Sequence, residues 1–239
     1  MNFYIGVLLL TNPKTRNENS QLSTIVPTQD IYDWQFRVRE DPKCLFLLCE
    51  ELGLVPNVWA LYEWANWLTP VQTFQKRFDA VFYICQIDNK PPVNIHKREY
   101  VHKLWCSPNE YIKEHITKRI ILPPPQFYEV SKLINFKTID EIRNYSFERQ
   151  NNGTERWLPF IYSYESSSSL FVYPGDFRYP QNPDLVSTDY SSDLKDDIQN
   201  DLNAGPLNRA IMKGGVLELI CNVDLNCGHY RPIPLKHQL

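Results

Sequence analysis

Two stretches rich in aromatic and branched residues limit the folds that this chain can adopt. Val58 to Leu68 and Phe78 to Ile87 favour extended backbone, and a polar loop, Thr69 to Lys76, separates them. A helix-start signal follows at residues 107–110, where a capping serine, a first-turn proline and a box glutamate stand at the right offsets. Strands combined with capped helices predict an α/β fold.

Two more helices are indicated further along the chain. The triproline at 123–125 predicts a rigid extended segment before a helix that starts near Gln126. Thr138 and Glu141 form a second capping box, for a helix that runs to about Glu148.

After about residue 153 the pattern changes to short strands. Pro159 to Tyr164 and Leu170 to Tyr173 flank a serine run, which predicts a hairpin. Residues 176–208 are polar, acidic and proline-bearing, so we expect a mobile loop or a partly disordered segment there. Val216 to Val223 predicts a last strand.

The composition excludes some classes of function. The 239 residues are 43% hydrophobic, enough for a sizeable core, and the net charge of -3 leaves no broad basic surface for nucleic acid. The apolar run from Ile5 to Leu10, expected as a buried strand from Gly6, is far shorter than the ~20 residues that span a bilayer. We find no secretion signal and expect an intracellular protein.

The cysteines indicate a reducing environment. None pairs in a C-x-x-C motif, and most lie in apolar strand-like or helical runs. We therefore expect reduced, mostly buried thiols rather than a disulfide framework or a zinc site. The six are Cys44, Cys49, Cys85, Cys106, Cys221 and Cys227.

The ten residues LLCEELGLVP, 47–56, raise the question of a metal site. The Nudix box, G-x5-E-x7-R-E-U-x-E-E-x-G-U with U bulky and aliphatic, ends in the same way, and its carboxylates share one helix face to hold divalent ions against a diphosphate. Glu50, Glu51, Gly53 and Leu54 fit its last positions.

The other positions of the box do not match this stretch. The required arginine falls on Phe46 and the next glutamate on Leu47, which puts an aliphatic side chain where the ion needs oxygen. We expect an ordinary solvated helix end instead, with Asp41 as the N-cap and Gly53 as the C-terminal glycine.

Five ordered stretches point to a known family. They are DPKCLFLLCEELGLVPNVWALYEWANWLTP, KRFDAVFYICQI, EYVHKLWCSPNEYI, ILPPPQFYEVSKLINF and ERWLPFIY. They resemble one Nudix family, the acyl-coenzyme A diphosphatases called nucleoside diphosphate-linked moiety X motif nineteen. The resemblance covers nearly everything from Gly6 to Tyr173 and implies a Nudix α/β/α sandwich over residues 1–150, with a C-terminal extension over 151–239 that holds short strands and a mobile acidic loop.

The sequence departs from this family at the catalytic box. The family's box ends E-E-x-G-V-L-L-L, and the matching place here is residues 3–10, where Phe3 and Tyr4 replace the last two metal-binding glutamates. We expect the sandwich to be incomplete, with the early strands and the box helix absent.

For a complete relative, the resemblance implies a Mg²⁺- or Mn²⁺-dependent hydrolase. It would cleave the diphosphate of coenzyme A or acyl-coenzyme A into an (acyl-)phosphopantetheine and adenosine 3′,5′-bisphosphate. None of the metal ligands can be transferred to a residue here, so we assign no catalytic or metal-binding residue and expect the chain as given to be inactive.

Side chains around two loops could still shape a substrate pocket. An arginine near a diphosphate and aromatic rings against an adenine or acyl chain are physically sensible. The alternative interpretation is that the rings are core and that Arg77 with Asp79 is a cross-strand pair. The candidates are Trp67, Arg77, Asp79, Glu99, Phe127 and Tyr128, next to Thr69 and Glu129.

Three interpretations remain open: an N-terminally incomplete diphosphatase, a non-catalytic protein that binds coenzyme A or a partner, and a fragment that does not fold stably.

The five histidines show no clear metal-ligand spacing, and structural roles are expected for them. The family implies a peroxisomal or mitochondrial location, but the terminal His237, Gln238, Leu239 keeps only the leucine of the peroxisomal signal.

Overall fold

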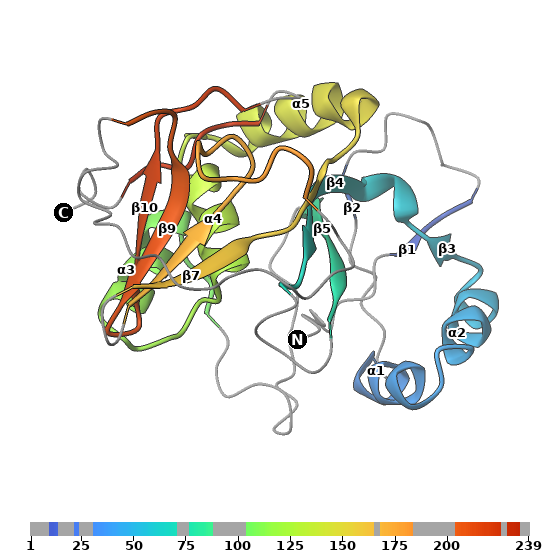
Figure 1. The fold of residues 1–239 in the computed structure, drawn as a ribbon. Helices are drawn as coiled ribbons and strands as arrows, with labels where there is room; N and C mark the ends of the chain where they lie inside the picture. Colours follow the sequence, from blue (N-terminus) through green and yellow to red (C-terminus); the bar gives the residue numbers. More distant parts are fainter. Residues whose placement is uncertain are drawn as a thin grey trace. The chain divides into compact units, whose positions relative to one another are not determined.

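A computed structural model describes residues 10–13, 22–23, 31–70, 77–87, 104–164, 168–183, 204–225 and 229–234. The chain divides into two compact units (Figure 1). The first comprises Met1–Tyr62 with Tyr83–Trp105, and the second comprises Glu63–Phe82 with Cys106–Leu239.

The first unit has a small core between two helices and a two-stranded ladder. The helices are α1 (Ile31–Glu40) and α2 (Cys44–Leu52), and β1 (Leu10–Thr11) pairs antiparallel with β3 (Val55–Pro56). Helix α1 was not predicted. The core is formed by four buried side chains, Leu10, Trp34, Leu48 and Cys49.

Helix α2 ends as predicted but begins later. Gly53 closes it in the left-handed conformation, with φ of 63°. Asp41 is not its N-cap: the helix starts after Lys43, whose backbone N–H donates to Asp41 Oδ1 at 2.9 Å. The aspartate therefore stabilises the turn before the helix rather than the helix itself.

The predicted strand at residues 58–68 is shorter in the structure. Val58–Ala60 form a 3-10 turn, η1, and β4 begins only at Leu61 (Leu61–Leu68). The second strand, β5 (Asp79–Ile87), is close to its predicted bounds. In the first unit, the end of β5 pairs in parallel with β2 (Leu22–Ser23).

The second unit contains a four-stranded antiparallel sheet of order β10-β9-β8-β7 (Figure 1). The predicted hairpin is confirmed as β7 (Phe160–Tyr164) and β8 (Ser168–Val172), and β10 (Val216–Cys221) matches the predicted last strand. Strand β9 (Asn208–Lys213) was not predicted, and its first residue lies in the segment predicted to be a mobile loop.

Three helices belong to the second unit, and two of them have a side-chain N-cap. Ser107 makes the predicted reciprocal capping box with Glu110 at the start of α3 (Pro108–Ile116). Helix α4 (Pro124–Leu133) begins inside the triproline, and α3 and α4 both contact β10. In α5 (Ile139–Arg149), followed by the 3-10 turn η2 (Gln150–Asn152), Thr138 accepts from the Glu141 N–H.

A cluster of aromatic rings fills the second unit. Strand β6 (Arg156–Trp157) pairs in parallel with β4 and puts Trp67 opposite Trp157, with ring centroids 5.3 Å apart. Tyr128 of α4 and Tyr173 pack edge-on against Trp67 at 5.6 and 5.4 Å. Such pairs add about 0.5–1.5 kcal/mol each beyond area burial.

The mixed α/β class is confirmed, while the three-layer sandwich, its incompleteness and the division at residue 150 stay predictions. Of the predicted strand at 99–105, residues 99–103 lie outside the described residues, and 104–105 form no regular element. Residues 184–203 of the predicted loop also lie outside them. No helix within the described ranges is long and apolar enough to cross a bilayer.

Candidate functional site

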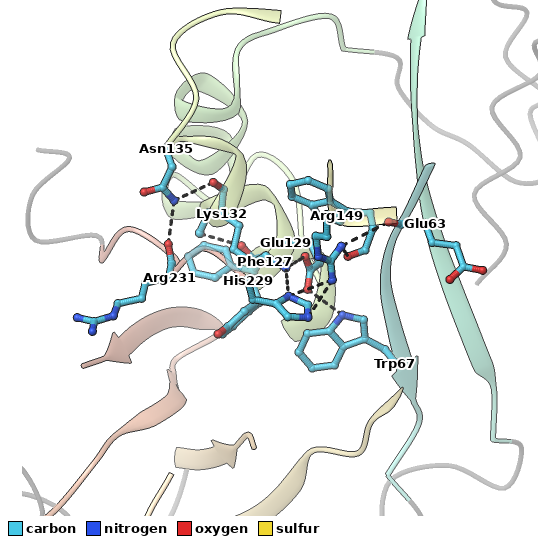
Figure 2. A network of polar contacts seen from close by, with 12 residues as sticks. Glu63, Trp67, Phe127, Glu129, Lys132, Asn135, Arg149, His229 and Arg231 are labelled. Atoms are coloured by element: carbon cyan, nitrogen blue, oxygen red, sulfur yellow. Dashed lines mark hydrogen bonds and ion pairs between the residues drawn. The ribbon is translucent and has the colours of Figure 1, made fainter. Parts of the chain in front are cut away.

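A buried network of polar side chains joins α4, α5, β4 and the segment at His229 (Figure 2). Glu129 accepts from the Trp67 indole at 3.0 Å and from Lys132 Nζ at 2.6 Å. Arg149 donates to the Trp64 carbonyl at 2.6 Å, and its Nη2 lies 2.8 Å from Nε2 of His229.

The network holds more cations than carboxylates. Glu129 pairs with Lys132, and Lys132 and Arg149 both face the His229 ring. Burial lowers the pKa of Lys132 despite that carboxylate. Burial, then Lys132 and Arg149, lower the pKa of His229 to about 3, so this imidazole is neutral at pH 7. A neutral ring has one acceptor nitrogen, so its tautomer decides which of these contacts is a hydrogen bond accepted by the ring.

Three of the candidate residues lie together in the interior. Trp67, Phe127 and Tyr128 are 3%, 1% and 0% exposed. Tyr128 donates to Asn208 Oδ1 at 2.9 Å, and Phe127 packs on the His115 ring at 4.9 Å. These contacts are typical of core residues, and a role of the three rings in substrate binding stays a prediction.

A second buried ion pair adjoins this core. Arg209 and Asp176 meet through two contacts of 2.7 Å, with side chains 1% and 0% exposed. Asp176 also accepts from the Asn208 N–H at 2.9 Å. Asp176 therefore does not belong to a mobile loop, because its carboxylate is fixed in the interior.

Two of the other candidates, Arg77 and Asp79, lie just before and at the start of β5. Thr69 and Phe78 exchange backbone and hydroxyl hydrogen bonds of 2.9–3.1 Å, and Arg77 Nε donates to the Thr69 carbonyl at 3.0 Å. Asp79 pairs with Arg156 at 3.0 Å, where the side chains are 44% and 47% exposed. Glu99 lies outside the described residues.

The described residues do not fit a divalent metal ion. Glu50 and Glu51 are exposed on the last turn of α2, and Leu47 is 50% exposed beside them. No group of three His, Cys, Asp or Glu side chains within the described ranges could hold a metal. The five described cysteines are free, and Phe3, Tyr4 and Cys227 lie outside the described residues.

Sequence reasoning missed Lys132, Arg149 and His229 as one cluster. A partial signal existed: Glu129 and Lys132 are three residues apart and so share a face of α4. Nothing in the sequence indicated that a histidine 97 positions after Lys132 would join them.

Comparison with known proteins identifies relatives for nearly the whole chain. It is 33% identical to an acyl-coenzyme A diphosphatase NUDT19 of Gallus gallus over 97% of its length, and 32% identical to that of Xenopus laevis over 98%. The Homo sapiens protein is 36% identical over 80% of the chain.

The chain spans only part of these relatives, namely 64%, 63% and 51% of their lengths. No solved structure matches it. The family profile described as NUDT19 Nudix domain matches residues 3–133, which is more than half of the chain. The chain therefore belongs to the NUDT19 Nudix family.

Proposed function

We propose that this chain acts on coenzyme A or an acyl-coenzyme A, in the reaction class of diphosphate hydrolysis. The observation that carries the proposal is the similarity over 97% and 98% of the chain to relatives named acyl-coenzyme A diphosphatases. The family membership of residues 3–133 supports the same class of substrate.

In this proposal the buried residues of the second unit support the site rigidly, and Arg77 supplies the contact to the ligand. The network around Glu129 and the rings of Trp67, Phe127 and Tyr128 are buried, so they would position neighbouring segments rather than touch the ligand. The half-buried Arg77 is the candidate for a diphosphate contact, since a guanidinium donates charge-assisted hydrogen bonds to phosphate oxygens. Its Nε is held by the Thr69 carbonyl, which fixes the direction of the side chain.

A second candidate function is binding of coenzyme A without hydrolysis. It is favoured by Phe3 and Tyr4, which by resemblance stand where the family's box carries its last two metal-binding glutamates. We derive no metal-dependent step for this chain. The two candidates share one ligand and differ in turnover.

A product assay separates the two candidates. Purified protein of residues 1–239 is incubated with coenzyme A and Mg²⁺ or Mn²⁺, and adenosine 3′,5′-bisphosphate is measured by chromatography. Binding without this product supports the second candidate, and product formation supports hydrolysis by the chain. Arg77→Gln is expected to weaken binding by about tenfold, the loss of a charge-assisted hydrogen bond. Failure of the wild type to bind would remove both candidates.

A further inference from the structure

A hollow of ≈ 290 Å³ opens on the second unit, away from the residues assigned above. Its wall combines Phe136, Tyr145 and Tyr230, and Glu141 and Glu148 of α5 line it as well. Pockets for drug-sized ligands measure roughly 300–1,000 Å³, so this one fits a single head group.

The aromatic wall is held in place from behind. The centroids of the Phe136, Tyr145 and Tyr230 rings lie 4.9–5.1 Å apart, and Trp64 packs edge-on against Phe136 and Tyr145. Tyr230 is 44% exposed, so part of its ring is open to a ligand. A preorganised wall lowers the ordering entropy that binding must overcome.

The buried network anchors the segment that carries Tyr230 (Figure 2). The residue before it, His229, is held between Lys132 and Arg149, and the carbonyl of the residue after it, Arg231, accepts from Asn135 Nδ2 at 2.8 Å. The ring is thus positioned from both sides along the chain.

The polar groups of the hollow are mainly acceptors. Asn135 uses both amide N–H groups on the carbonyls of Lys132 and Arg231, which leaves its Oδ1 as the remaining group. Glu141 accepts the Lys137 N–H at 2.7 Å through one oxygen, and the exposed Glu148 has no partner among the described residues. No lysine or arginine lines the hollow among these residues, although Asn144 adds an amide that can donate.

We propose that the hollow binds a small organic cation, an alkylammonium or guanidinium group, over the Tyr230 ring with Glu148 as its counter-ion. A cation gains from the negative face of an aromatic ring within about 6 Å and from a carboxylate beside it. An anion would meet two carboxylates, and an uncharged apolar group would desolvate them without compensation.

The charge behind the wall does not cancel this preference. Lys132 and Arg149 exceed Glu129 by one positive charge, and Glu141 with Glu148 adds two negative charges, so this set of side chains is net negative by one. The two cations lie on the buried side, and Lys132 Nζ is 5.1 Å from the Trp64 ring centroid. The open face of the hollow presents the carboxylates.

Ligand-observed NMR titration of the full chain at low salt tests the proposal, with n-butylammonium and N-acetylarginine amide as probes. Saturable binding is expected, and Glu148→Gln and Tyr230→Leu should each weaken it about threefold or more. Glu51→Gln removes the same charge from an exposed helix end on the first unit, so this control should leave binding unchanged.

A third probe, acetyl-Gly-Arg-Gly-amide, distinguishes two sources of the cation, an arginine of a peptide and a free small molecule. Binding at least tenfold tighter than that of the free probes would support an arginine of a peptide, and equal binding would support a free small molecule. Absence of saturable binding by the wild type, or equal affinity in Glu148→Gln, overturns the proposal. Far-UV circular dichroism verifies that each variant is folded.

Discussion

The indole Nε1 of Trp67 donates to Oε1 of Glu129 at 3.0 Å, across 62 positions of sequence. This bond links β4 to α4 in the interior, while the other oxygen of Glu129 binds Lys132. One carboxylate therefore satisfies a buried indole N–H and a buried ammonium, and both groups would be costly to leave without a partner.

Glu129→Gln should destabilise the protein by about 3–5 kcal/mol, because glutamine can still accept from Trp67 but leaves the Lys132 charge unpaired in the interior. Urea unfolding followed by tryptophan fluorescence measures the change. Adding Lys132→Met should recover part of the loss, since the unpaired charge is then removed. Glu114→Gln is the control and should change stability by less than about 1 kcal/mol, because it breaks a pair with Arg119 near the surface, where the two side chains are 24% and 64% exposed. Equal effects of the two single changes would contradict the buried pair.

Asp176→Asn should also cost about 3–5 kcal/mol, since Arg209 then keeps a buried charge without a counter-ion. The matched variant is Asp79→Asn, which removes the same charge from the half-exposed pair with Arg156 and should cost at most about 1 kcal/mol. Both are compared by thermal and urea unfolding. A mild effect at Asp176 would restore the expectation of a mobile segment there.

His229 should make stability depend on pH. Its folded pKa of about 3 lies below the ordinary value of 6.5, so the unfolded state binds one more proton between these values. The contribution of His229 to the free energy of unfolding is complete above pH 6.5. It is lost as pH falls toward 3, by about 1.4 kcal/mol per pH unit. Denaturation at a series of pH values should show a shallower slope in His229→Gln. The same slope in both proteins would exclude a buried neutral imidazole.

Gly53→Ala should destabilise the protein by about 1–2 kcal/mol, because alanine is strained at a φ of 63°. No atom lies within 4 Å of an added Cβ, so the cost comes from the backbone alone. Gly53→Asn should cost less, since asparagine tolerates the left-handed region better. Urea unfolding compares the three proteins, and an alanine variant as stable as the wild type would refute the cap.

Local signals in the sequence predicted local structure well. Ser107 with Glu110 and Thr138 with Glu141 carry their own hydrogen-bond partners within one turn, so those helix starts could be located without tertiary information. The serine run between two branched strands similarly predicted the β7–β8 hairpin.

Features that depend on distant partners were not predicted. The local sequence predicts a loop at Asp176, because its ion pair depends on Arg209, which lies 33 positions later. Strand β9 and helix α1 lack strong local patterns, and their backbone is fixed by neighbouring elements. The rings of Trp67 and Tyr128 were compatible with both core and pocket, and only their burial distinguishes the two.

The central claim is that coenzyme A is the ligand class of this chain, and calorimetric titration of metal-free protein tests it most directly. We predict a saturable heat with coenzyme A and none with pantethine, which lacks the diphosphate and the nucleotide. The absence of a saturable heat with coenzyme A at millimolar concentration, in protein that unfolds cooperatively, would contradict the account.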